Sequence, residues 1–91
     1  YMNIGVLYSN KGKFKQALDH YYKSLKYSVE ANDPMNEGIV LGNIGNIYNK
    51  IDNFEKAIFY YEKAIKVNKK NQILVSLAYN YYNLSLMYQS K

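Results

Sequence analysis

The sequence contains no cysteine, no arginine and a single histidine among its 91 residues. Without cysteine, disulfide bonds, thiolate zinc sites and cysteine nucleophiles are excluded. Asp19 lies next to the one histidine, His20, but neighbouring residues on a helix point about 100° apart, so the two do not form a catalytic dyad. The sequence shows no nucleophile–base pair, no phosphate-binding loop and no metal-ligand spacing. We therefore expect no enzyme activity in this segment, no catalytic residue, no metal site and no cofactor.

Charged residues make up only 21% of the chain, and the longest uncharged stretch covers residues 71–90. A stretch of about 20 residues is long enough to span a bilayer. However, Asn80 and Asn83 lie near its middle, where hydrocarbon offers an amide no hydrogen-bond partner. The sequence therefore predicts no membrane insertion.

The sequence repeats itself with a step of 40 residues. The tripeptide at residues 3–5 recurs at 43–45 and, in a weaker form, at 83–85. The same step relates further identical residues: Tyr8 and Tyr48, Phe14 and Phe54, Ala17 and Ala57, Tyr21 and Tyr61. A match of this length without a gap is typical of a repeat protein.

Apolar residues within each repeat follow helical spacing, and no segment has the alternation of a strand. The pattern predicts five helices, over residues 1–10, 14–31, 34–50, 54–69 and 72–90. Asp33-Pro34 is typical of a helix start, with Asp as N-cap and Pro at the first helical position. Gly12 and Asp52 occupy equivalent turns, and both residue types end a helix with little strain. We expect consecutive helices to form antiparallel hairpins that stack on one another.

These residues resemble the tetratricopeptide repeat. The first-helix signature of that family, W-x2-L-G-x2-Y, is similar to residues 1–8 and 41–48 and, with serine in place of glycine, to 81–88. The second-helix signature A-x3-F appears with tyrosine at 17–21 and 57–61. The small residues let paired helices cross closely. The resemblance covers the whole chain and implies an all-α fold, a right-handed α-solenoid of antiparallel helix hairpins with about two and a half units and five helices.

The resemblance also implies a single array fragment over residues 1–91. Unit 1 covers 1–31 and lacks the start of its first helix, unit 2 covers 32–71, and 72–91 is the first helix of unit 3. Because the chain starts at a tyrosine within a helical pattern, we expect an excerpt of a longer protein. The 40-residue period is longer than the 34 residues usual in the family. Repeats of this long-period type look like those of bacterial sensors and regulators and of adaptor proteins.

In this family the first helices of successive units line a concave groove, and the second helices form the convex back. The resemblance places nine residues in a peptide-binding groove: Ile39, Asn43, Asn46, Asn49, Lys50, Tyr79, Tyr82, Asn83 and Leu86. An asparagine amide offers both donor and acceptor, so it can pair with the backbone of an extended peptide of any sequence, and tyrosine or leucine can hold apolar side chains. The alternative is that these asparagines only form hydrogen bonds between neighbouring helices.

The net charge of +5 comes from lysines that lie mainly on the predicted second helices. They alternate with acidic residues such as Glu55 and Glu62, and arginine, the residue that most often reads bases, is absent. This pattern is typical of a solvated convex face. We expect no nucleic-acid partner.

Two hypotheses of function therefore remain. The first is a non-catalytic module that binds a protein or peptide in the groove, in a cytoplasmic protein. The second is a structural assembly element that forms a homo-oligomer through exposed terminal helices, because solenoid ends need a cap. For that second hypothesis, we expect one face of Leu84, Met87 and Tyr88 to lack a partner.

Overall fold

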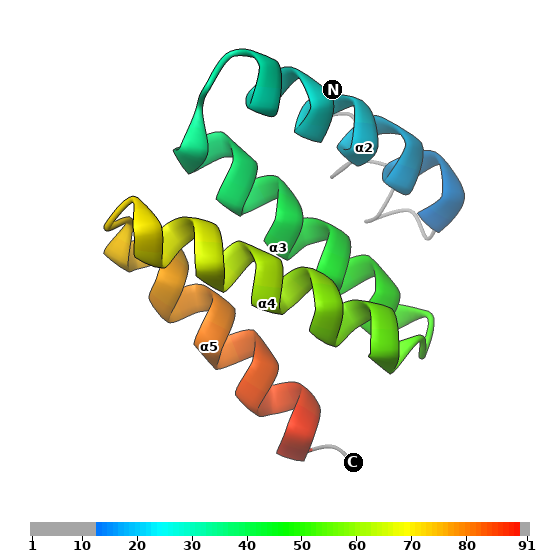
Figure 1. Ribbon diagram of the computed structural model, residues 1–91. Coiled ribbons are helices and arrows are strands. Elements are labelled where there is room, and N and C mark those ends of the chain that lie inside the picture. Colours follow the sequence, from blue (N-terminus) through cyan, green and yellow to red (C-terminus); the bar gives the residue numbers. More distant parts are fainter. Residues whose placement is uncertain (1–12, 90–91) are drawn as a thin grey trace.

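The computed structural model describes residues 13–89, which form four α-helices and no strand (Figure 1). The helices are α2 (Phe14–Glu30), α3 (Pro34–Lys50), α4 (Phe54–Lys70) and α5 (Leu74–Gln89). Each helix reverses the direction of the one before it, from α2 at the top of the view to α5 at the bottom. The helix predicted over residues 1–10 and the turn at Gly12 lie outside the described residues. Within residues 13–89, no helix combines the length and the apolar character needed to cross a membrane.

The three turns between these helices have the same backbone conformation. Asn32, Asp52 and Gln72 have positive φ angles of 53°, 64° and 57°. The amide after each of them returns to a carbonyl of the last helical turn, as Asn53 N does to Tyr48 O at 2.8 Å. This Schellman arrangement satisfies carbonyls that the helix end would leave unpaired. The prediction that Asp52 ends a helix is confirmed.

Helix starts follow the capping residues of the sequence. The side chain of Asp33 accepts a hydrogen bond from Asn36 N at 3.2 Å, with Pro34 at the first helical position, so both bounds predicted for the helix 34–50 are confirmed. Asn53 caps α4 in the same way, accepting from Lys56 N at 3.3 Å. The last helix begins at Leu74, two residues later than predicted, because Gln72 takes the left-handed backbone that closes α4.

The core forms where α2, α4 and α5 pack against α3. Tyr61 of α4 is fully buried, and its ring lies so close to Gly45 of α3 that a Cβ there would be 2.7 Å from Cδ1. This agrees with the prediction that small residues allow the helices to cross closely. Met87 is 2% exposed and belongs to the core. The expectation that Met87 lacks a partner is therefore wrong: together with Asn80, seven positions earlier, it faces inward.

Candidate functional site

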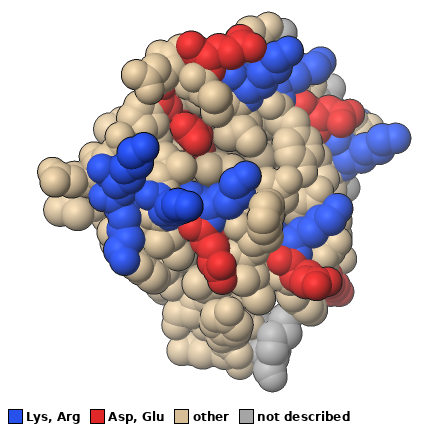
Figure 2. All heavy atoms as spheres, viewed as in Figure 1, with Lys and Arg blue, Asp and Glu red and all other residues tan. Residues whose placement is uncertain are grey.

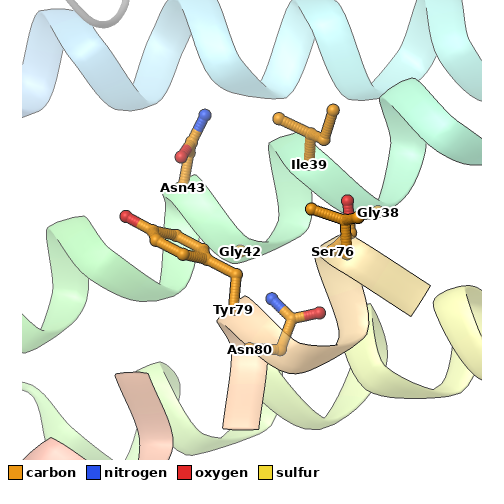
Figure 3. Close-up of a pocket in the computed structure, with 8 residues that line it drawn as sticks. Gly38, Ile39, Gly42, Asn43, Ser76, Tyr79 and Asn80 are labelled. Atoms are coloured by element: carbon orange, nitrogen blue, oxygen red, sulfur yellow. The ribbon is translucent and has the colours of Figure 1, made fainter. Parts of the chain in front are cut away.

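A pocket of about 170 Å³ lies between α3 and α5, which contact each other although α4 separates them in the sequence. Its lining consists of four pairs of residues four positions apart, two pairs from each helix: Gly38 and Gly42, Ile39 and Asn43, Val75 and Tyr79, Ser76 and Asn80. Residues four apart share one face of a helix. The two helices therefore present one flat face each to the pocket (Figure 3).

Three of the nine predicted site residues line this pocket, namely Ile39, Asn43 and Tyr79. Asn43 and Tyr79 extend from opposite helices at one end of it (Figure 3). Asn43 is half-buried, and among the described residues its amide has no hydrogen-bond partner.

Two other predicted asparagines, Asn46 and Asn49, bind within the protein. The hydroxyl of Tyr61 donates to Oδ1 of Asn46, and the side chain of Asn49 also forms a hydrogen bond with Tyr61. The pKa of Tyr61 is raised to about 12, mainly by burial and less by the charge that Tyr79 would carry, while the bond with Asn49 opposes this rise. The hydroxyl therefore stays protonated at neutral pH and acts as the donor. For these two asparagines the structure matches the alternative of bonds between helices.

The remaining predicted residues lie beyond the pocket. Tyr82 and Leu86 are exposed on α5, and Lys50 is exposed in the last turn of α3. Asn83 is half-buried, and its Nδ2 is buried without an acceptor among the described residues. Asn83 resembles Asn43 in lacking a partner among the described residues, but its Nδ2 is shielded from solvent.

Sequence reasoning missed the polar floor of the pocket. Asn80, which is 2% exposed, accepts a hydrogen bond from Nδ2 of the buried Asn68 at 2.6 Å. A Cβ at Gly38 would lie 2.2 Å from Oδ1 of Asn68, and one at Gly42 would lie 2.9 Å from Nδ2 of Asn80. The sequence signal for this floor is the pair of glycines four positions apart. Glycine destabilises a helix interior, so two glycines on one helix face indicate that another group approaches the backbone closely there.

The outer face of α5 forms a second depression, of about 430 Å³. Its lining residues are Tyr81, Leu84, Ser85, Tyr88 and Gln89. Each lies 40 positions after a residue on the face of α3 that α4 covers. Leu41 and Tyr48 are 2% and 8% exposed, whereas their counterparts Tyr81 and Tyr88 are 46% and 55% exposed. Among the described residues, nothing covers this face of α5 as α4 covers α3.

Lysines of α2 and α4 alternate with acidic residues on the face that Figure 2 presents. On α4, for example, Glu55 precedes Lys56 and Glu62 precedes Lys63. The lining of the α3–α5 pocket, by contrast, contains no charged residue.

Comparison with known proteins gives one match. A family model described as tetratricopeptide repeat matches residues 1–70. That span includes α2, α3 and α4 and one wall of the pocket. No curated protein and no solved structure matches the chain significantly.

Proposed function

Because the chain belongs to the tetratricopeptide repeat family, whose repeats mediate protein–protein interaction, we propose that it binds an extended peptide or partner segment along the groove between α3 and α5. In this proposal the module has no catalytic activity of its own. Asn43 and Asn83 pair with the backbone of the bound segment, and Ile39, Tyr79, Tyr82 and Leu86 contact its side chains. Lys50 lies at the end of the groove.

The observation that supports this proposal most is the difference among the four asparagines. Tyr61 engages the amides of Asn46 and Asn49, whereas those of Asn43 and Asn83 have no partner among the described residues. A buried polar group without a partner costs free energy. A ligand backbone would supply the missing partners.

The wider arrangement belongs to the same proposal. We propose that residues 1–31, 32–71 and 72–91 are successive units of a right-handed array with five helices; the structure describes four helices, α2 to α5. The alternation of lysines with acids on α2 and α4 (Figure 2) favours a protein partner over nucleic acid. We also propose that the parent protein is located in the cytoplasm, and cell fractionation tests this location.

Selection from a random peptide library tests the groove directly. The Asn43→Ala/Asn83→Ala double variant serves as the counter-target, and Asn46→Ala is the matched control because its amide is already engaged by Tyr61. We expect peptides that converge on one motif, bind the parent chain and Asn46→Ala, and lose at least tenfold in affinity with the double variant. Convergent peptides that bind all three proteins equally would contradict the proposal, and so would a selection that never converges.

A second candidate function is self-association through the outer face of α5, with a second copy of the chain as the occupant. The exposure of Tyr81 and Tyr88, whose counterparts on α3 are buried, favours it. Sedimentation velocity of Tyr88→Lys against Tyr82→Lys separates the faces, because the two tyrosines are similarly exposed on one helix. Loss of a dimer in Tyr88→Lys alone would support self-association, and a monomeric parent chain would exclude it.

A further inference from the structure

The pocket between α3 and α5 has the size of a single side chain. Its volume is about 170 Å³, and an apolar protein cavity of roughly 150 Å³ binds benzene. Ile39, Val75 and the ring of Tyr79 supply apolar walls, and no charged residue lines it. A bound carboxylate or ammonium would find no counter-ion in this lining. The occupant is therefore uncharged and mostly apolar.

Besides the amide of Asn43 and the hydroxyls of Ser76 and Tyr79, which also line the pocket, Asn80 contributes a hydrogen-bond donor at its floor. Its Oδ1 is occupied, because Asn68 donates to it at 2.6 Å. This bond turns the Nδ2 of Asn80 toward Gly42 and the pocket (Figure 3). Among the described residues Nδ2 has no acceptor, although the side chain is only 2% exposed. Nδ2 of Asn80 is therefore a donor at the pocket whose direction is fixed by the buried Asn68.

The glycines opposite these amides keep the donor accessible. A Cβ at Gly42 would lie 2.9 Å from Nδ2 of Asn80, and a Cβ at Gly38 would displace Asn68, which orients it. Both glycines line the pocket. Their missing side chains therefore make room for the amide pair and also leave the pocket open beside it.

We propose that this pocket takes one uncharged side chain of the partner, apolar along its length and ending in a hydrogen-bond acceptor, as a tyrosine side chain does. The acceptor binds Nδ2 of Asn80, and the apolar body lies between Ile39 and Val75. This inference rests on the proposed function, since it names the residue class that anchors the partner segment in the groove. The inference also predicts that the pocket discriminates against side chains without a hydrogen-bond acceptor, because a site that binds a polar group rejects an analogue lacking that group.

Small probes test the pocket without a known partner. Heteronuclear NMR of the whole chain follows the backbone amides of Gly38 and Gly42 and the side-chain amide of Asn80 during titration with p-cresol, toluene and 4-methylbenzoate. We expect saturable shifts at these groups with p-cresol, in the millimolar range usual for ligands of this size. Toluene, which lacks the acceptor, and 4-methylbenzoate, which carries a charge, should bind at least fivefold more weakly.

A pair of matched variants assigns the shifts to the pocket. Ser76→Gln places a larger side chain in its lining, whereas Ser85→Gln makes the same change on the outer face of α5. We expect p-cresol binding to disappear in Ser76→Gln and to persist in Ser85→Gln, with both spectra otherwise folded. Toluene binding as tightly as p-cresol, shifts confined to Ser85 and its neighbours, or no saturable shift would each overturn the inference.

The probe titration and the peptide selection test separate claims, so either can give a negative result while the other succeeds. Peptides that converge and need Asn43 and Asn83, combined with probes that do not bind, would leave the proposed function standing and overturn the anchor. Probes that bind as expected, combined with a selection that never converges, would support the pocket and overturn peptide binding in the groove.

Discussion

The ring of Tyr61 lies against the backbone of Gly45, and a Cβ at Gly45 would be only 2.7 Å from Cδ1 of that ring. The hydroxyl of the same tyrosine donates a hydrogen bond to Asn46, the next residue of α3. One side chain therefore sets the distance between α3 and α4 and also occupies an amide that would otherwise face the groove. Tyr61 therefore affects both the packing of the two helices and the amides that remain for a ligand. Substitutions can separate these two effects.

Gly45→Ala should destabilise the protein. Overpacking of a tight core costs up to about 3 kcal/mol, and alanine regains roughly 1 kcal/mol of helix propensity over glycine, so we expect a net loss of about 2 kcal/mol. Ser85→Ala is the matched control, because Ser85 lies 40 positions later on an exposed face. Urea unfolding followed by circular dichroism measures both. Equal stability of the two variants would contradict the close packing at Gly45.

Asn46→Ala and Asn43→Ala should differ in stability. Both substitutions gain the helix propensity of alanine, but Asn46 accepts from Tyr61, so Asn46→Ala should be less stable than Asn43→Ala by about 1 kcal/mol, the usual net value of such a bond. Asn43 has no partner among the described residues, and Asn43→Ala should leave stability unchanged or raise it slightly through helix propensity. Thermal unfolding of both variants tests this. A larger loss in Asn43→Ala would mean that its amide supports the fold.

Gln72→Gly should stabilise the protein. Gln72 has a φ of 57°, and a left-handed backbone costs a residue with a side chain roughly 1–2 kcal/mol. Glycine removes this cost but loses roughly 0.5–1 kcal/mol through its greater freedom in the unfolded chain, so the net gain should be about 0.5–1 kcal/mol. Asn32→Gly should gain less, because asparagine tolerates this conformation. A Tm that falls in Gln72→Gly would contradict the account of the turn.

Alkaline pH should lower the stability of the protein, in part through Tyr61. Its pKa is raised by burial to about 12 from the ordinary 10, so the folded state holds the proton more tightly than the unfolded chain. The resulting stability is complete below pH 10 and is lost as the pH rises from 10 to 12. A shift of two pKa units corresponds to at most roughly 3 kcal/mol. In Tyr61→Phe this part of the pH dependence should be absent. Parallel pH profiles between 9 and 12 would contradict it.

The helices and their order could be predicted from the sequence because local signals decide them. The helical spacing of apolar residues and the cap at Asp33-Pro34 act within a few residues, and the 40-residue step shows that such local patterns recur along the chain. The start of α5 was predicted too early because glutamine is not a residue type expected at positive φ. There the hydrogen bond from Ile73 N to Asn68 O, at 2.9 Å, fixes the turn.

The site could be predicted only in outline. Helical spacing and the family resemblance placed Ile39, Asn43 and Tyr79 on helices that face each other across the pocket. The buried pair Asn68–Asn80 could not be found in this way, because it depends on how α4 and α5 pack and on the glycines opposite. The difference between Asn46, which accepts a hydrogen bond within the protein, and Asn43, which has no described partner, could not be predicted either. It depends on which asparagine the hydroxyl of Tyr61 contacts across the interface of α3 and α4.

The most direct test of the central claim is the position of a bound peptide on the protein. A peptide from the selection, labelled with a nitroxide, broadens the amide signals of nearby residues in the NMR spectrum. The account predicts broadening at Gly38, Gly42, Asn43 and Tyr79, along the groove between α3 and α5. Broadening centred instead on Tyr81, Ser85 and Tyr88 would place the peptide on the outer face of α5 and contradict binding in the groove.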